Sequence, residues 1–416
     1  MNKNTFDVIV IGGGPAGLMA AGTAAKKELT VLLLEKKHKT GLKLGLTGKG
    51  RCNLTNMRDT NEFNKQFGKN GKFLIDAFKH FFNKDLIQFF KEINIETTHE
   101  RGERVFLKGI KAPQAATYLS NWAIKNKVQI ITNCSAKKIT LNKKEAIKEI
   151  SDDQGKTYYS KNVIIATGGK SYPQTGSTGD GYNIAKIFGH KIVKVTPALT
   201  PLLYDDSYLN LLNGLTLKNV SISLIINNKI KEKMFGEIEF IDDTISGAIP
   251  YTLSKQVIKA LENKKDVELS IDLKPALEHN KLDLRLLREI NNKDNKNMFD
   301  FLSKLMPSKL QTFCITKNIV EADSNIRNYN KNDRKKLRLW LKDFRIKITS
   351  HASFKRAIIT SGGVSLKEVN PKTMESKLIK GLYFCGEILD LDGQTGGYNL
   401  QAAFSTGYTA GINIYK

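Results

Sequence analysis

A glycine-rich turn near the start of the chain constrains the fold more than any other feature of the sequence. Residues 6–11 read FDVIVI, a short apolar run that is typical of a buried parallel strand. The run GGGPAG at 12–17 follows at once and leads into an Ala-rich segment. A second apolar run, TVLLL at 30–34, ends at Glu35, 18 residues after Gly17. Together these pieces predict a strand–helix–strand unit.

Each small residue of this turn has a separate physical task. Gly12 permits the tight turn, Gly14 lets the backbone approach a pyrophosphate, and Gly17 allows the helix to pack closely on the strand. The helix N-terminus, next to Ala16, offers free N–H groups to phosphates. Glu35 ends the second strand, where its carboxylate can accept hydrogen bonds from a ribose diol. The unit therefore predicts a dinucleotide site.

Two later glycine turns decide between FAD and NAD. ATGG at 166–169, which contains Gly168, follows the apolar run VIIA, and Gly386-Glu387 follows LYFC at 382–385 and precedes GGYNL at 396–400. Flavoproteins with two dinucleotide-binding domains, which this pattern resembles, gather three such pieces around one flavin. The last helix is expected to direct its positive end at the flavin and to stabilise its anionic reduced form. We therefore predict FAD.

No second GxGxxG of the strand–turn–helix type is present, so the sequence predicts no separate NAD(P)H domain. A nicotinamide donor would then have to visit the flavin directly and leave. NAD(P)H is accordingly expected as a transient electron donor.

The sequence changes character after about residue 195, where apolar and polar residues alternate, with Asn227-Asn228 as a hairpin-turn signal. Residues from about 275 to 344 have helical Leu spacing, and 346–361 read as strands. We predict an α/β plus β fold: a discontinuous, glutathione-reductase-like FAD Rossmann domain with an inserted antiparallel β domain that carries a helical insert. The predicted bounds are 1–195 and 360–416 for the FAD-binding domain, 196–272 and 345–359 for the β domain, and 273–344 for the helical insert domain.

Composition excludes several classes of protein. No apolar run reaches the ~18–20 residues that span a bilayer. Because the given sequence runs directly into its first predicted strand, we expect no signal peptide. The four cysteines are far apart and form no CxxC pair, which argues against a metal site or a disulfide redox centre. We expect a cytoplasmic enzyme with reduced thiols and no membrane partner.

Lys and Arg exceed Asp and Glu by 25. An RNA partner would account for this excess, because phosphate neutralisation supplies most non-specific affinity for nucleic acids. The alternative is AT-biased coding that enriches Lys and Asn on solvated surface, as in Lys143, Lys144 and Lys148. If RNA is the partner, cations of 327–356 and of the loops near 36–51 and 101–111 should share the face on which the flavin opens. The cations of 327–356 are Arg327, Arg334, Lys335, Lys336, Arg338, Lys342, Arg345, Lys347, Lys355 and Arg356.

Aromatic residues interleave with these cations, among them Tyr329, Trp340, Phe344 and Phe354. Such a pattern could stack a splayed base. For the aromatics we favour burial on the apolar face of an amphipathic helix, together with Leu337, Leu339 and Leu341.

Four stretches identify a family resemblance that covers essentially the whole chain. The chain resembles the bacterial FAD-dependent oxidoreductases labelled aminoacetone-oxidase-like, which include the flavoprotein dihydrouridine synthases of 23S ribosomal RNA. The matching stretches are GGGPAGLMAA at 12–21, TGKGRCNLTN at 47–56, ATGGKSYPQTGSTGDGYNIAKIFGH at 166–190, and GGVSLKEVNPKTMESKLIKGLYFCGEILDLDGQTGGYNLQAAFSTG at 362–407. The segment from about 205 to 350 matches weakly, with Asp242 where the family has a histidine and Ala248 where it has a proline.

The resemblance implies a set of FAD contacts. Lys43, Arg51, Asn53 and Thr55 would line the flavin, Ala136 would meet the adenine, and Glu387 would lie near the ribityl–phosphate. Other residues would approach the isoalloxazine, namely Asp392, Gly397, Asn399 and Leu400. Pyrophosphate and ribose contacts would come from Gly12, Gly14, Ala16, Gly17 and Glu35, and Gly168 belongs to the second turn.

Arg51 and Cys52 are the catalytic candidates. A cation at Arg51 could bind a substrate carbonyl or the flavin's own oxygens, and a thiol at Cys52 could act as an acid. A packing role in a tight loop is the favoured interpretation of Cys52. The run TGDG at 178–181 is an anion-site candidate or simply a helix cap. No Ser-His-Asp arrangement is evident, and His190 is expected to be structural.

The resemblance implies one of two reactions. The first is reduction of a uridine in 23S ribosomal RNA, with hydride from reduced flavin N5 to uracil C6, protonation of C5, and a cation such as Arg51 at O4. The second is a small-molecule NAD(P)/FAD oxidoreductase reaction of the amine-oxidase or enone- and steroid-reductase type. A flavin-binding sensor without activity is a third alternative. The charge favours the RNA reaction, because a small amine or steroid does not require so basic a protein.

Overall fold

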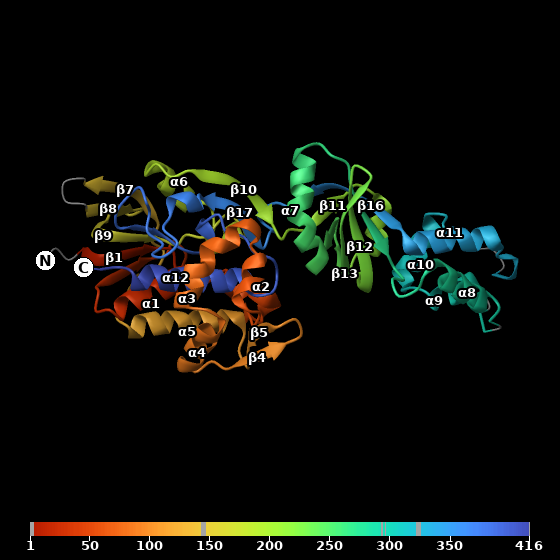
Figure 1. Cartoon of the computed structure of the whole chain (residues 1–416), viewed down its shortest axis with the longest axis horizontal. Coiled ribbons are helices and arrows are strands. Elements are labelled where there is room, and N and C mark those ends of the chain that lie inside the picture. The colour runs from red at the N-terminus through yellow and green to blue at the C-terminus, as the bar shows by residue number, and fades with distance from the viewer. Residues whose placement is uncertain (1–3, 143–146, 293, 296, 322–325, 416) are drawn as a thin grey trace. The chain divides into compact units, whose positions relative to one another are not determined.

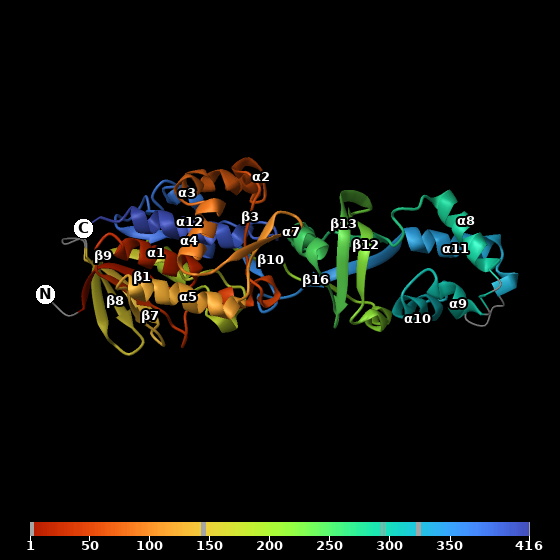
Figure 2. The ribbon, with the colours of Figure 1, turned by 90° about the horizontal axis from the view of Figure 1, so that it is seen from below.

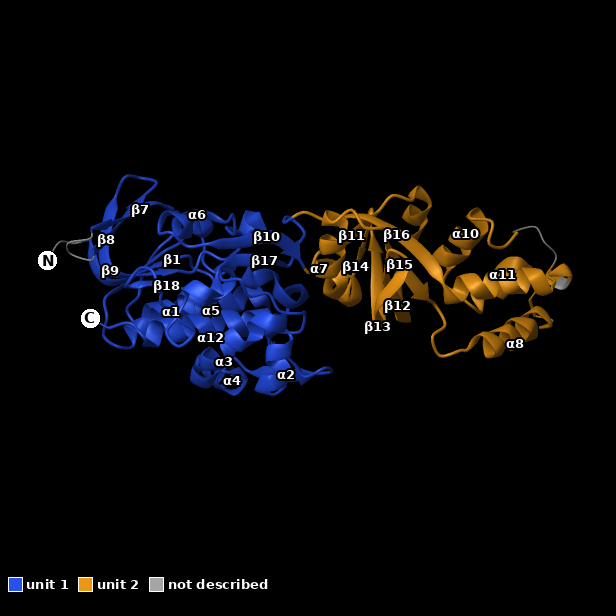
Figure 3. Cartoon of the chain, turned by 45° about the horizontal axis from the view of Figure 1, so that its top comes forward, with its two compact units in different colours: residues 1–198, 354–416 blue, residues 199–353 orange. Residues whose placement is uncertain are grey.

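The computed structural model describes residues 4–142, 147–292, 294–295, 297–321 and 326–415 (Figure 1). Contacts divide the chain into two compact units, coloured separately in Figure 3. Unit 1 comprises residues 1–198 and 354–416, and unit 2 comprises residues 199–353. Each has its own hydrophobic core. The predicted fold class, a discontinuous Rossmann domain with an inserted β domain, is confirmed. The finer division into three domains stays a prediction.

Unit 1 is built on a sheet in the order β6-β2-β1-β9-β8-β7, with β18 also paired to β9. The strands β6, β2, β1, β9 and β18 are parallel, whereas β7 and β8 form an antiparallel extension. The carboxyl ends of the parallel strands therefore meet at one edge, where ligands bind in open α/β sheets. The strands are β1 (Thr5–Ile11), β2 (Val31–Leu34), β6 (Gln129–Ile131), β7 (Ala136–Asn142), β8 (Ile147–Asp152), β9 (Thr157–Ile165) and β18 (Leu382–Phe384).

Two further sheets complete this unit. β3, β5 and β4 form a small antiparallel sheet, and β10 pairs with β17. Their bounds are β3 (Asn53–Asn56), β4 (Thr97–Glu100), β5 (Arg104–Leu107), β10 (Ile192–Ala198) and β17 (Ile359–Val364). The helices of the unit are α1 (Pro15–Ala25), α2 (Thr60–Lys65), α3 (Ile75–His80), α4 (Asn83–Glu92), α5 (Ala112–Lys125), α6 (Asp180–Ile187) and α12 (Tyr398–Ile412), with 3-10 turns η1 (Leu44–Gly50), η2 (Gly68–Leu74), η3 (Pro173–Thr175), η6 (Leu366–Glu368) and η7 (Gly386–Ile388).

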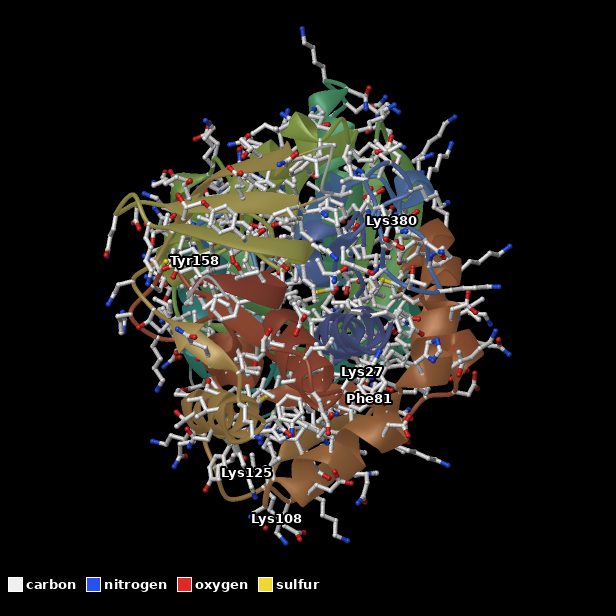
Figure 4. All side chains as sticks on the ribbon, turned by 90° about the vertical axis from the view of Figure 1, so that its left-hand side faces the viewer. Lys27, Phe81, Lys108, Lys125, Tyr158 and Lys380 are labelled. Carbon is white, nitrogen blue, oxygen red and sulfur yellow. The ribbon has the colours of Figure 1, made fainter. Side chains whose placement is uncertain are left out.

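The segment 73–93, with its helical apolar spacing, is broken into α3 and α4. Phe81 is extended between them, with φ of −159°. Its ring stacks on Tyr408 at 4.6 Å between centroids, and its carbonyl accepts a hydrogen bond from Ser405 Oγ. Contacts to α12 therefore override the local helical pattern. Figure 4 shows α12 end on, with Phe81 and Lys27 beside it.

Helices α1 and α12 come from opposite ends of the sequence and pack side by side, as Figures 1 and 2 both show. A Cβ on Gly407 would lie 2.3 Å from the Ala16 carbonyl oxygen, and one on Gly411 would lie 2.6 Å from that of Ala20. Only glycine permits such an approach of two helix backbones. Lys27 Nζ adds hydrogen bonds to the carbonyls of Ile412 and Ile414 at the end of α12.

Unit 2 contains a closed antiparallel barrel in the order β11-β14-β13-β12-β15-β16. The hairpin predicted at Asn227-Asn228 is confirmed, because both residues have positive φ and join β12 to β13, as a type I′ turn requires. The barrel strands are β11 (Leu202–Tyr204), β12 (Thr216–Ile226), β13 (Lys229–Ile241), β14 (Thr244–Ser246), β15 (Val267–Asp272) and β16 (Phe344–His351).

The segment 196–272, predicted as part of the β domain, also contains a helix. Helix α7 (Ala248–Glu262) follows Gly247 and buries Ile249, Leu253 and Val257, which have the i, i+4, i+8 spacing of one helix face. The other helices of unit 2 fall where the sequence predicts them. They are α8 (His279–Ile290), α9 (Met298–Ser303), α10 (Ser308–Thr316) and α11 (Lys331–Lys342). The unit also contains the 3-10 turns η4 (Ser207–Leu212) and η5 (Ile326–Asn328).

Lys148 corrects the expectation that residues 142–148 are solvated surface. Lys143 and Lys144 lie outside the described residues, but Lys148 has no exposed surface. Its Nζ donates to the carbonyls of Lys161 at 2.6 Å and Lys380 at 2.9 Å. Burial lowers the pKa of Lys148 to about 8, and the nearby carboxylate of Glu375 opposes the shift.

We predict a pH dependence from this buried lysine. Between pH 8 and the ordinary lysine pKa of ~10.4, the folded protein releases a proton that the unfolded chain still binds, so raising the pH stabilises the fold. The substitution Lys148→Met removes this contribution. Urea unfolding at pH 7.5 and pH 10 should show wild type gaining stability relative to Lys148→Met as the pH rises. A constant difference between the two proteins would contradict the assignment.

Candidate functional site

The first two glycine turns touch each other at the carboxyl edge of the parallel strands. Gly12 has φ of 106°, and a Cβ there would lie 2.5 Å from the Ala166 carbonyl oxygen. A Cβ on Gly17 would lie 1.9 Å from the Gly12 carbonyl oxygen, whereas one on Gly14 would meet nothing within 4 Å. The turn is thus closed by contact at two glycines and open at the third. That opening, at the N-terminus of α1, is the place predicted for a pyrophosphate.

Glu35 is held by the backbone on both sides of its carboxylate. Oε2 accepts from Gly13 N at 2.7 Å, and Oε1 accepts from Lys37 N at 2.8 Å. Burial raises the pKa of Glu35, and these two amide hydrogen bonds oppose the shift. The same residue's carbonyl accepts from Cys134 N, in the loop that leads to Ala136. The residues expected at the ribose and the adenine therefore lie beside one another.

A polar cluster joins four distant segments next to this edge. Lys43 Nζ contacts Glu387 Oε2 and Ser171 Oγ, each at 2.6 Å. The other carboxylate oxygen of Glu387 accepts from Ser171 Oγ and from Thr360 N, both at 2.8 Å. The Thr360 hydroxyl in turn accepts from the amide of Lys170. Two predicted site residues, Lys43 and Glu387, thus form an ion pair that the sequence did not predict.

The third turn caps α12. Gly397, at the helix start, has φ of 97°, and a Cβ there would lie 2.4 Å from the Thr55 carbonyl oxygen. The Asn399 side chain bonds the amide and carbonyl of Gly393, so it shapes the loop before the helix. Asp392 accepts from Ser361 Oγ at 3.0 Å. Leu400, half-buried, follows in the first turn of α12.

Helices α1 and α12 present their N-termini in the same direction. Gly407 faces Ala16 and Gly411 faces Ala20, so the axes run parallel. Tyr398 precedes Gly407 by nine residues, whereas Pro15 precedes Ala16 by one. At the α-helical rise, the start of α12 extends about 12 Å beyond the start of α1. Two positive helix ends in this staggered arrangement suit an elongated, anionic dinucleotide.

Arg51 is exposed and rigidly held. Its Nη2 contacts both oxygens of Glu100 on β4 at 2.8 Å, and its guanidinium lies 4.3 Å above the ring of Phe106 on β5. The neighbouring Cys52 has no exposed surface, and burial raises the pKa of its thiol to about 12. These facts favour a packing role for Cys52 over an acid role. They leave Arg51 as the accessible member of the pair.

Several buried polar atoms of these segments have no partner among the described residues. They are Asn53 Oδ1, Thr167 Oγ1, Tyr182 Oη and Gln394 Oε1. Buried polar groups are normally hydrogen-bonded, so each of these atoms is open to a polar ligand. Thr167 stands next to Gly168 in the second turn and Asn53 is a predicted flavin residue. The residues present therefore fit FAD.

Thr167, Tyr182, Gln394, Ser171 and Thr360 are residues of this region that the sequence analysis missed. Thr167 and Ser171 lie in or beside the second glycine turn, which was the available signal. Tyr182 follows Gly181 in α6, where a Cβ on Gly181 would lie 2.1 Å from Thr167 Oγ1.

The TGDG run at 178–181 makes an internal contact. At the TGDG run, Lys36 Nζ contacts Asp180 Oδ2 at 2.5 Å, so the start of α6 is already occupied by an internal ion pair. Burial favours the neutral form of Asp180, but the contacts to Lys36 and Thr178 lower its pKa overall. The acidic side chain in the first turn of α6 is thus paired with a cation of this chain.

The structure also brings together Ser376, His190 and Glu368, in the order of a catalytic triad. His190 Nε2 lies 2.8 Å from Ser376 Oγ, and its Nδ1 lies 3.4 Å from Glu368 Oε2. However, Ser376 Oγ already accepts from two backbone amides and is buried, as is His190. Desolvation lowers the pKa of His190. The cluster fixes a turn, in agreement with the structural role expected for His190.

Comparison with known proteins identifies the family. The profile described as "HI0933-like protein Rossmann domain" matches residues 6–413. The chain belongs to this family. It is 30% identical to the ribosomal RNA dihydrouridine synthase of Haemophilus influenzae over 411 residues, and 29% identical to the 3-dehydro-bile acid delta(4,6)-reductase of Clostridium scindens over 410. The alignments cover 98% of both chains in the first case and 97% of both in the second.

Among solved structures, the 3-ketosteroid delta1-dehydrogenase of Sterolibacterium denitrificans superposes with a TM-score of 0.55 at 12% identity, covering 99% of both chains. This likeness concerns the fold. The family membership makes the protein an FAD-dependent oxidoreductase. Within the described residues, no cluster of metal-ligating side chains is present, and no helix is both long enough and apolar enough to cross a membrane.

We predict that Glu35→Ala weakens FAD retention. The change removes the carboxylate that orients Gly13 and that faces the predicted ribose, and loss of a charged hydrogen bond of this kind corresponds to a roughly 10- to 100-fold weaker affinity. FAD dissociation constants, measured by flavin fluorescence after reconstitution, test this. Glu92→Ala, the same change at an exposed position of α4, is the control. Equal affinity in wild type and Glu35→Ala would show that the ribose is held elsewhere.

Proposed function

We propose that the protein is a reductase that forms dihydrouridine in 23S ribosomal RNA. Two relatives of almost equal likeness carry names with different substrates, so identity does not decide between them. The observation that carries the proposal is the distribution of charge. Unit 1 contains 40 Lys and Arg against 21 Asp and Glu, whereas unit 2 contains 26 against 20. The basic excess is therefore concentrated in the unit that carries the flavin motifs.

This distribution favours RNA over a small apolar substrate. A positive field around a binding site raises the encounter rate with a polyanion and supplies salt-sensitive affinity. AT-biased coding would enrich Lys throughout the chain and would therefore raise the net charge of both units alike. The much smaller excess in unit 2, which is also Lys- and Asn-rich, argues against that explanation.

The proposed chemistry assigns tasks to residues of this chain. Bound FAD, once reduced, would supply hydride to C6 of an unstacked uracil, and a proton from solvent would complete the reduction at C5. Arg51 would donate to uracil O4, where negative charge develops, and Glu100 and Phe106 would hold its guanidinium in place. Lys43, Glu387 and the starts of α1 and α12 would bind and orient the cofactor.

NAD(P)H is the proposed electron donor. The sequence holds a single fingerprint of the required type, so nicotinamide would reach the flavin from solution and leave before RNA enters. Absorbance loss at the flavin band on mixing with NADH or NADPH measures this step directly.

Mass-spectrometric mapping of dihydrouridine tests the proposal. A strain that lacks the gene should lose a dihydrouridine from 23S ribosomal RNA, and the wild-type gene on a plasmid should restore it. If the deletion strain keeps every dihydrouridine of its 23S ribosomal RNA, and no second synthase acts at the same position, the small-molecule alternative is correct.

We predict that Arg51→Ala lowers the rate of uridine reduction about 100-fold, the usual effect of removing one donor to a developing oxyanion. FAD content should stay unchanged. Arg51→Lys keeps the charge but loses the planar guanidinium that lies over Phe106, so its rate should lie between those of wild type and Arg51→Ala. Single-turnover reduction of an rRNA fragment provides the measurement, and a full rate in Arg51→Ala would exclude the proposed role.

A small-molecule reductase remains the alternative function. The likeness to the bile-acid reductase supports it. It predicts turnover of an enone substrate without RNA and no dependence of that turnover on surface cations.

A further inference from the structure

The β4–β5 hairpin of unit 1 carries a dense group of cations beside the candidate site. We call residues 97–111 the basic hairpin. Its turn and the segment that follows expose Arg101, Arg104, Lys108 and Lys111. The hairpin holds four Lys and Arg and two acidic residues, Glu100 and Glu103, and residues 112–138 add four Lys and no Asp or Glu. Figure 4 labels Lys108 and Lys125, which flank α5, at the lower edge of that view.

A second basic segment lies against the first. Residues 36–58 contain seven Lys and Arg and no Asp or Glu. This segment includes β3, which pairs with β5, and η1, which packs on α5. The two segments therefore form one continuous basic region within unit 1, although 38 residues separate them in the sequence.

The arginine on β5, Arg104, is held in a fixed orientation, whereas Arg51 is already paired with Glu100. Arg51 and Arg104 both lie over the ring of Phe106, at 4.3 and 5.6 Å from its centroid. Arg104 Nε donates to the Arg101 carbonyl at 3.0 Å, which fixes the guanidinium. A planar, prepositioned guanidinium can bind a phosphate through two parallel hydrogen bonds.

The basic hairpin is also tied to the third glycine turn. Asn56 Nδ2 donates to the Gly102 carbonyl at 3.0 Å, in the hairpin turn, and to the Gly396 carbonyl at 3.2 Å, before α12. Met57 N donates to the Glu103 carbonyl. One asparagine thus links the cationic turn to the helix start predicted to face the isoalloxazine.

The cations of 327–356 are engaged differently. Arg334 and Arg338 both contact Asp283, and Lys342 contacts Asp272. Lys336 bonds a backbone carbonyl, and the pairs Arg345–Glu268 and Lys347–Asp266 are also internal to unit 2. Leu337 and Leu341 of α11 are buried as expected, but Leu339 is 46% exposed. Much of this basic stretch therefore stabilises its own unit, and Arg327's side chain lies outside the described residues.

We propose that the basic hairpin is the RNA-docking surface, binding the backbone phosphates that flank the uridine presented to the flavin. This inference rests on the proposed function and adds where the RNA binds. RNA held at Arg101, Lys108 and Lys111 would lie beside β3, whose residues are predicted to line the flavin. Charge complementarity supports this occupant, since polyanions bind where cations lack internal partners.

Two triple variants of equal charge change test the inference. The first is Arg101→Gln, Lys108→Gln and Lys111→Gln. The matched control is Lys281→Gln, Lys331→Gln and Lys335→Gln, which are exposed positions on α8 and α11. Full-length holoenzyme is measured for binding to a 23S rRNA fragment between 50 and 300 mM salt, for FAD content, and for the KM of NAD(P)H.

The hairpin variant should bind the fragment at least tenfold more weakly than wild type. Its log–log salt slope should fall by about 2 to 3, or roughly 0.7–0.9 for each lost phosphate contact. FAD content and the KM for NAD(P)H should not change, and the control should behave as wild type. Equal loss in both variants, loss in the control alone, or a raised KM for NAD(P)H in the hairpin variant would overturn the inference.

The same variants separate this inference from the proposed function. In the deletion strain, wild type and the control variant should restore dihydrouridine, and the hairpin variant should restore much less. If wild type itself restores none, the proposed function fails and the docking surface with it. If all three proteins restore it equally, the function stands and the hairpin is not the docking surface.

Discussion

The backbone contact between α1 and α12 is the constraint on which the rest of unit 1 depends. Gly407 and Gly411 let the last helix of the chain touch the first. This contact sets both helix N-termini at one edge of the sheet, staggered by about 12 Å. A side chain at either glycine would separate the helices and misplace the turn at Gly397. Residues 199–353 can therefore be inserted without disturbing a site that the two ends of the chain build together.

The ion pair between Lys43 and Glu387 completes this arrangement at short range. It joins the loop after β2 to the turn after β18. The Ser171 hydroxyl and the Thr360 amide connect it to the second glycine turn and to β17. Each partner is about one-fifth exposed, so the pair is only partly screened by water. A ligand anion near the N-terminus of α1 would thus meet a preformed, polar surface.

Local patterns explain which parts of the structure the sequence predicts. The fingerprint glycines, the strand ends and the Asn227-Asn228 hairpin depend on neighbouring residues, and all are found as expected. Helix α7 was missed because its short segment follows alternating strands, and the packing of Ile249, Leu253 and Val257 decides its form. The buried contact of Lys148 with Lys380 and the contact of His190 with Ser376 join residues that lie 186 or more positions apart, which no local pattern contains.

The central claim is that the flavin of this protein reduces a uridine in RNA. Anaerobic mixing of the prereduced holoenzyme with an unmodified 23S rRNA fragment tests it most directly. We predict that the absorbance of oxidised flavin returns at a rate that falls with salt, with one dihydrouridine formed for each flavin reoxidised. A flavin that stays reduced with the RNA but is reoxidised by a steroid enone would contradict the claim.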